Sequence, residues 1–316
     1  MTRFQPADLT RLKRLEAKKR PSLVDTSRLA RPPRRNDRIE DFLKGLPGIL
    51  KADDWRELLS AIAAARKKGK PIFWMLGAHV LKCGLSPVII DLMKSGIVDL
   101  LAFNGAGLIH DLELGFVGRT SEDVAVGLRD GSFGMARDTA SWFAGGVAES
   151  ASHGVGLGEG CGHYLNRQRA PHRRYSLLAQ ADTLDIPALV FPAIGAEIVA
   201  QHPEYDAAAV GAAAHLDFRI LADRCRRLNN GGVVLHFGSA VILPEVFLKA
   251  LTVARNRHKV EKFTTANFDM IQHYRPNVNV VTRPTLDTGR GLTFTGHHEL
   301  LLPLLAWSIK SVLRLA

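Results

Sequence analysis

The chain has 316 residues, of which 46% are hydrophobic and 23% charged, and its formal net charge at pH 7 is +11. This composition is typical of a globular protein that buries a sizeable core, and three cysteines are too few for a disulfide framework. The sequence contains no run of 18 or more apolar residues and no apolar signal core at its N-terminus, so we expect a cytoplasmic protein without a membrane partner.

The excess positive charge is concentrated at the start of the chain. Residues 1–44 contain 13 Lys or Arg against 6 Asp or Glu, a net charge of +7. The pattern predicts a basic N-terminal arm, residues 1–38, followed by a single α/β domain, residues 39–316. The arm is either a solvated, partly helical extension or a contact for nucleic acid or an acidic partner. No zinc finger, basic zipper or RNP-like signature is present, so nucleic-acid binding is not expected.

Helical and strand patterns alternate after the arm. Residues 39–70 predict two helices separated by Gly-Leu-Pro-Gly, and residues 71–78 predict a strand that ends at a glycine. Residues 85–96 predict a helix with Pro in its first turn, and residues 97–107 predict the next strand with its turn. Together the last three segments form a βαβ unit of the size expected for a parallel crossover.

The second half of the chain continues this alternation. Residues 120–131 predict the start of a helix, whereas the glycine-rich residues 130–165 give no clear pattern. Further strands are expected within 186–198, 230–242, 262–269 and 278–285, and further helices within 244–258 and 296–315. The alternation predicts an α/β fold with a Rossmann-like parallel sheet and helices on both faces.

Ligands of open α/β sheets bind at the carboxyl ends of the strands. Several of the expected strand ends carry turns rich in glycine or polar residues, which favours a nucleotide-sized ligand: residues 77–79, 104–107, 195–197, 235–238 and 264–267. The G-x-G-x-x-G pattern is absent, because "GAGLIH" has His110 in place of the last glycine. Histidine and cysteine at 153, 161 and 163 have no second ligand pair, so no metal is expected.

The segments "CGLSPVIIDLMKSGIVDLLAFNGAGLIHDLE", "TSEDVA", "IPALVFPAIGAEI", "NGGVV" and "LLLPLLAW" resemble the deoxyhypusine synthase family. The resemblance extends over roughly residues 40–312 and is most specific in residues 84–123. It implies a deoxyhypusine synthase-like NAD-binding fold, NAD as cofactor, and a homotetramer with active sites between subunits. It also implies dehydrogenation of spermidine and transfer of its aminobutyl group by way of an enzyme lysine.

The resemblance also assigns roles to individual residues. The residues expected to contact NAD are Asn104, Gly105, Ala106, Glu197, Thr264, Thr265, His297 and His298. The residues expected at the reacting groups are His110, His236, Asp269 and Arg283, and His202 is expected to bind substrate. Asp111 follows His110 and is expected to orient its ring.

The departures from the family pattern redirect the predicted chemistry. Ile109, His110 and His202 stand where the family has substrate-binding acids, and Arg283 is the best match to its nucleophilic lysine. An arginine cannot lose its proton to become an amine nucleophile. We therefore expect a less anionic pocket, a neutral or anionic small-molecule substrate, and NAD-dependent transfer of an alkyl (aminobutyl-type) group to a small-molecule acceptor. The alternative is a catalytically inactive NAD-binding relative with a regulatory or interaction role.

Overall fold

A single parallel sheet organises the molecule. The computed structural model describes residues 3–315 and contains six strands: β1 (Ile72–Leu76), β2 (Leu100–Asn104), β3 (Ala188–Phe191), β4 (Val233–Phe237), β5 (Thr264–Asp269) and β6 (Arg290–Thr295). Their order is β3-β2-β1-β4-β5-β6, and every neighbouring pair is parallel. This is the strand order of a doubly wound dinucleotide-binding sheet, so the predicted fold class is confirmed.

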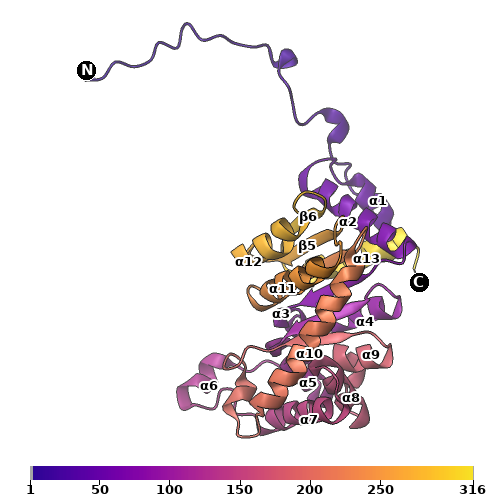
Figure 1. Cartoon of the computed structure of the whole chain (residues 1–316). Helices are drawn as coiled ribbons and strands as arrows, with labels where there is room; N and C mark the ends of the chain where they lie inside the picture. Colours follow the sequence, from indigo (N-terminus) through magenta and orange to yellow (C-terminus); the bar gives the residue numbers. More distant parts are fainter. Residues whose placement is uncertain (1–2, 316) are drawn as a thin grey trace.

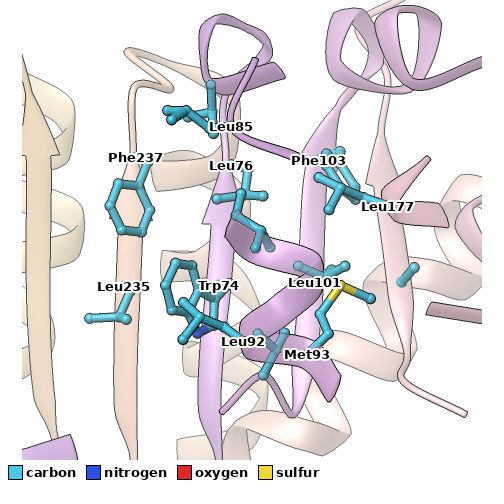
Figure 2. Close-up of a cluster of buried hydrophobic side chains, with 14 of the residues drawn as sticks. Trp74, Leu76, Leu85, Leu92, Met93, Leu101, Phe103, Leu177, Leu235 and Phe237 are labelled. Carbon is cyan, nitrogen blue, oxygen red and sulfur yellow. The ribbon is translucent and has the colours of Figure 1, made fainter. Parts of the chain in front are cut away.

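The central strands are buried on both sides because their side chains alternate between two hydrophobic clusters. In β1, Trp74 and Leu76 point into the larger cluster, and Phe73 and Met75 into the smaller one. Figure 2 shows Trp74 beside Phe237 of the neighbouring strand β4, where the two rings stack at 5.3 Å between centroids. An unbroken apolar strand therefore indicates a parallel sheet covered on both faces.

Helices from both halves of the chain cover the two faces (Figure 1). The larger cluster is covered by α1 (Ile39–Gly45), α2 (Leu50–Lys67), α4 (Ser86–Lys94), α9 (Leu177–Thr183) and α13 (His298–Leu313). The smaller cluster is covered by α10 (Ala207–Cys225) and α11 (Ile242–Arg257). The predicted helices in residues 39–70, 85–96, 244–258 and 296–315 are confirmed.

The glycine-rich residues 130–165 form two closely packed helices. These are α7 (Arg137–His153) and α8 (Leu157–Arg167), which lie in the long connection between β2 and β3 with α5 (Gly105–Val117) and α6 (Val124–Asp130). A Cβ atom on Gly160 would overlap the Ser150 side chain across the α7–α8 contact. Glycine thus lets the two backbones approach. The same glycines interrupt the apolar periodicity from which a helix is predicted, so the sequence did not indicate these two helices.

The prediction of a strand within residues 278–285 is wrong. Residues Asn277–Thr282 form a π-helix, η6, which follows the short α12 (Tyr274–Pro276) and continues into the 3-10 turn η7 (Arg283–Thr285). Prolines bracket this β-branched run. Val280 and Val281 are buried, because the run packs against the sheet as part of the connection between β5 and β6. The sixth strand follows as β6, which the sequence analysis did not predict. Its Arg290 and Gly291 are unusual in a strand, although Leu292 and Phe294 face the core.

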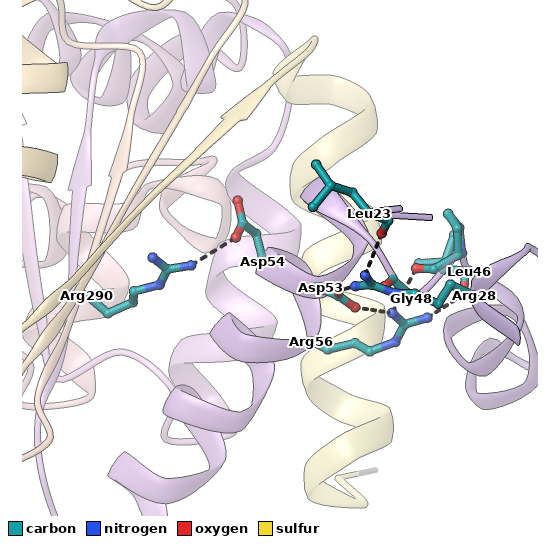
Figure 3. Close-up of polar contacts among 9 residues, drawn as sticks. Leu23, Arg28, Leu46, Gly48, Asp53, Asp54, Arg56 and Arg290 are labelled. Atoms are coloured by element: carbon teal, nitrogen blue, oxygen red, sulfur yellow. Dashed lines mark hydrogen bonds and ion pairs between the residues drawn. The ribbon is translucent and has the colours of Figure 1, made fainter. Parts of the chain in front are cut away.

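The arm leaves the body as an extended chain with two 3-10 turns, η1 (Ala17–Lys19) and η2 (Thr26–Arg28) (Figure 1). Figure 3 shows how its end is attached: Arg28 donates to the carbonyl oxygens of Gly48 (2.6 Å) and Leu23 (3.0 Å) and pairs with Asp53 (3.3 Å). The division of the chain at residue 38 stays a prediction. None of the helices between residues 3 and 315 combines the length and apolarity needed to cross a membrane.

Candidate functional site

The turns after β1 and β4 meet at the point where the strand order reverses. Gly77 ends β1 and begins α3 (Ala78–Lys82), and Gly238 follows β4 with a left-handed φ of 62°. A Cβ atom on Gly77 would overlap the carbonyl oxygen of Gly238. Only glycine lets the two backbones lie this close at the carboxyl edge of the sheet.

A pocket of about 210 Å³ lies at the carboxyl ends of β2 and β3. Its walls come from the start of α5, the end of α3, the loop before α6 and the turn after β3. The charged or titratable side chains that line it are Lys82, His110, Glu113, Glu122 and Glu197. The apolar part of the wall includes Ile109, Val124, Phe133 and Ile198. The volume is below the roughly 300–1,000 Å³ of sites for drug-sized ligands, so the pocket suits only a smaller molecule.

His110 is held by a chain of hydrogen bonds that ends at a carboxylate. Its Nδ1 lies 2.6 Å from Oγ1 of Thr120, and Thr120 donates a very short hydrogen bond to Glu113. Thr139 donates to the other Glu113 oxygen at 2.9 Å. Burial alone would raise the pKa of Glu113, but the nearby His110 and the hydrogen bonds from Thr120 and Thr139 outweigh it and hold that pKa below its ordinary value. The carboxylate is therefore ionised and can only accept.

Asp111 does not orient His110, contrary to the prediction. Its carboxylate accepts from the backbone N–H groups of Leu177 (2.7 Å) and Leu178 (3.0 Å) and from the Ser176 hydroxyl (2.5 Å) at the start of α9. Burial raises the pKa of Asp111 to about 6. Consecutive residues of a helix point in different directions, whereas residues three apart share a face, so Glu113 is the partner of His110. The spacing His-x-x-Glu in the sequence is the pattern from which this pairing could have been predicted.

Three glutamates line the pocket, of which only Glu197 was a predicted site residue. Glu197 accepts from the Ala193 N–H with both oxygens (2.9 and 3.0 Å), and Glu122 accepts from the Gly134 N–H (3.1 Å). Burial raises the pKa of Glu197. With Glu113 these acids outnumber the single lysine that lines the pocket. The pocket of this chain thus has an excess of acids, and whether it is less anionic than the pockets of the family stays a prediction.

Glu197 also explains the glycine at the start of α5. A Cβ atom on Gly105 would overlap the Glu197 carboxylate. The N-terminus of α5 is further capped by Asn104, whose Oδ1 accepts from the Gly107 N–H at 3.1 Å. A carboxylate already lies at this helix N-terminus, and it would repel a phosphate but accept hydrogen bonds from ribose hydroxyls.

A second group of polar side chains lies at the carboxyl ends of β4, β5 and β6. His236 is fully buried, and its Nδ1 lies 2.6 Å from Oδ1 of Asn267. Burial lowers the pKa of His236 to about 4, so its imidazole is neutral at pH 7. His298, at the start of α13, is 1% exposed, and neither ring nitrogen has a hydrogen-bond partner among residues 3–315. His79 lies 6.0 Å from His298 between ring centroids, and Asp269 is buried at the end of β5.

Five further predicted residues do not line the pocket: Thr264, Thr265, Arg283, His202 and His297. Thr264 and Thr265 begin β5, so they lie at the amino ends of the strands, away from the carboxyl edge. Arg283 is exposed in η7, before β6 begins, and donates to Asn279 at 2.9 Å. His202 hydrogen bonds to the Gly134 carbonyl oxygen (2.7 Å) and ties the loop before α7 to the turn η4 (Ile198–Gln201). His297 is the N-cap residue of α13 without a capping hydrogen bond from its side chain, which is largely exposed.

No group of three or more His, Cys, Asp or Glu side chains within residues 3–315 is arranged to hold a metal ion. His163, part of the histidine and cysteine group in α7 and α8, pairs instead with Asp182 at 2.9 Å.

Comparison with solved structures shows the fold. The chain matches a putative deoxyhypusine synthase from Entamoeba histolytica with a TM-score of 0.50 and 11% identity, over 87% of this chain and 93% of that one. It matches AgrE, in a ternary complex with ornithine and NAD⁺, with a TM-score of 0.50 and 13% identity, over 81% of this chain and 32% of AgrE. ArgZ, a cyanobacterial arginine dihydrolase, matches with a TM-score of 0.49 and 16% identity, over 82% of this chain and 31% of ArgZ.

The chain thus spans about a third of the length of AgrE and ArgZ and nearly all of the Entamoeba protein. No protein-family model and no curated protein matches its sequence. The similarity establishes a deoxyhypusine synthase-like, Rossmann-like fold.

Proposed function

We propose that this protein is an NAD-dependent enzyme that oxidises a small amine and transfers the resulting alkyl group to a small-molecule acceptor. The observation that carries the proposal is the pocket at the carboxyl ends of β2 and β3, which combines three carboxylates with a histidine. Carboxylates favour a cationic amine, and a histidine can take up its proton. The proposal keeps the predicted aminobutyl-type transfer and replaces the predicted neutral or anionic substrate by a cationic one.

The carboxyl edge fits NAD in part. The reversal of strand order between β1 and β4 marks the edge at which dinucleotides bind in sheets of this strand order. At the start of α5, Glu197 lies against Gly105 and lines the pocket with Ala106, where its carboxylate would accept hydrogen bonds from a ribose. On the side of β4 and β5, Nε2 of His236 and both ring nitrogens of His298 are buried without partners among the described residues. When bound, NAD would supply the acceptor for a hydride. AgrE, which shares the fold, has been seen with NAD⁺.

The acceptor in this proposal is a small molecule because Arg283, the best match to the family's nucleophilic lysine, lies away from the carboxyl edge. Lys82 lines the pocket instead, and its ammonium makes no ion pair with the described residues. Lys82 is thus the lysine to examine for a transient imine.

The first test is NAD binding, measured by titration calorimetry. Gly105→Val should abolish binding, because the added side chain would displace the Glu197 carboxylate from the start of α5. Gly211→Val is the matched control, since a Cβ atom there meets no atom within 4 Å. Equal NAD affinity in the folded Gly105→Val variant and the wild type would refute this placement.

The second test is turnover, followed by NADH absorbance with a series of alkyl diamines and with the corresponding carboxylic acids. We expect the amines to reduce NAD and the carboxylic acids not to reduce it. Binding of NAD without reduction by any amine would favour the alternative, an inactive relative that acts as a regulatory or interaction protein. An imine trapped by borohydride on Lys82 would show that the alkyl group passes through the enzyme before it reaches the acceptor.

A further inference from the structure

The hydrogen bonds around Glu113 determine which nitrogen of His110 carries the proton. Thr120 has a single hydroxyl proton and donates it to Glu113. Since Glu113 is ionised, it cannot donate a proton back, and the Thr120 oxygen can therefore only accept from His110. Nδ1 of His110, 2.6 Å away, must be the donor. In the neutral ring Nε2 then carries a lone pair and no proton.

Nε2 is the nitrogen available to a ligand. His110 lines the pocket, its side chain is 17% exposed, and Nε2 makes no hydrogen bond with the residues described. Glu113 lies behind the ring, with an oxygen 3.8 Å from Nδ1. A buried carboxylate in this position stabilises the imidazolium that forms when Nε2 takes up a proton. The neutral Thr120 hydroxyl connects the His110 ring to the Glu113 carboxylate through its two hydrogen bonds.

We infer that His110 is a general base, oriented by Glu113 through the Thr120 hydroxyl, which removes a proton from an ammonium group bound in the pocket. The N–H bond of the ammonium breaks, its electron pair stays on the nitrogen, and the proton forms a bond to Nε2. His110 is the catalytic residue, and Thr120 and Glu113 are positioning residues. The amine as substrate class rests on the proposed function, whereas the polarity of the hydrogen-bond chain rests on the contacts alone.

The other charged groups that face His110 are Lys82 from α3, Glu122 from the loop before α6 and Glu197 from the turn after β3. Both glutamates accept from backbone N–H groups, so neither is needed to orient the ring. They are instead placed to attract the ammonium. The base and the groups that bind the cation are thus separate parts of the same pocket.

The test reads the proton position directly, by ¹⁵N NMR of the intact protein labelled at histidine, with His110→Gln used to assign the signal. The wild type should show His110 protonated at Nδ1 and bare at Nε2 when neutral. Thr120→Val should lose this preference, and Thr120→Ser, which keeps the hydroxyl, should retain it. Protonation predominantly at Nε2 in the wild type would overturn the inference without any activity measurement.

Two further measurements separate the base from the substrate class. Butylamine should shift the His110 signal and butyrate should not; a response to butyrate alone would contradict the binding of an ammonium. With a substrate amine, His110→Gln should lower kcat/KM about 10²–10⁴-fold, and Thr120→Val should lower it and alter its pH profile while Thr120→Ser restores both. If no amine reduces NAD, the proposed function fails, but the NMR result still decides the orientation of His110. Unchanged kcat/KM in His110→Gln would refute the catalytic role.

Discussion

Asp217 is a buried acid whose environment links stability to pH. One oxygen accepts from the N–H groups of Val190 (2.8 Å) and Gly158 (3.0 Å), and the other has no partner among residues 3–315. Burial raises the pKa of Asp217 from 3.8 to about 8. The folded state thus holds a proton that the unfolded state has already lost between these values. Raising the pH through this window therefore reduces stability.

We expect the free energy of unfolding of the wild type to fall between pH 6 and 8, by at most about 1.4 kcal/mol per pH unit from this residue. Asp217→Asn keeps a neutral group that can accept from both N–H groups, so its stability should change little over the same range. Urea denaturation at several pH values measures both slopes. Asp111, with a pKa of about 6, contributes mainly below this range. Equal slopes in the two proteins would contradict the proposed role of Asp217.

At the scale of the elements, Arg28 connects the arm to the loop between α1 and α2. Its guanidinium has three partners, as described above, and the side chain is 40% exposed. We expect Arg28→Ala to lower the free energy of unfolding by about 1 kcal/mol, the typical contribution of such a hydrogen bond. Deletion of residues 1–22, which precede these contacts, should leave it unchanged.

Thermal unfolding followed by circular dichroism measures both effects. Arg20→Ala is the matched control, because Arg20 makes no hydrogen bond or ion pair with the described residues. A large loss of stability on deletion of residues 1–22 would show that the arm packs on the domain, and would refute the expectation that it is a solvated extension.

At the scale of the whole molecule, α13 presents an apolar stripe to the exterior. Leu300 is 68% exposed and Trp307 57% exposed, and Leu304 lies between them at helical spacing. Leu301 and Leu304 also line an apolar groove of about 250 Å³ with Trp55 and Phe294. Exposed apolar surface of this kind is typical of a protein–protein interface, and it supports the proposal of a homo-oligomer. The resemblance to the family implies that this oligomer is a tetramer.

We expect light scattering at micromolar concentration to give an oligomeric mass for the wild type. Trp307→Glu should shift the mass toward the monomer, because a carboxylate in an apolar interface loses its hydration without gaining a partner. Leu128→Glu, on α6 at the other end of the molecule (Figure 1), is the control for an exposed leucine outside this stripe. A monomeric wild type would refute the assembly.

The sequence by itself determined the alternation of elements and hence the fold class. Apolar strand runs such as 72–76 and helices marked by proline or capping residues are local patterns, and the structure has them where they were expected. The run at 278–285 was misread because β-branched residues favour a strand locally, while its place over the sheet is a tertiary matter. The helices at 137–167 were missed because glycine was selected for close packing rather than for helix propensity.

The site was predictable only in part, because spatial neighbours at a sheet edge come from separate segments. His110 and Glu197 were identified from turns after β2 and β3, and the structure brings both to one pocket. Thr264 and Thr265 were assigned to the wrong end of β5, since a one-dimensional pattern does not say where a strand begins. Only the tertiary structure could decide that Glu113 and Thr120 orient His110, because hydrogen-bond direction depends on the positions of individual atoms in space.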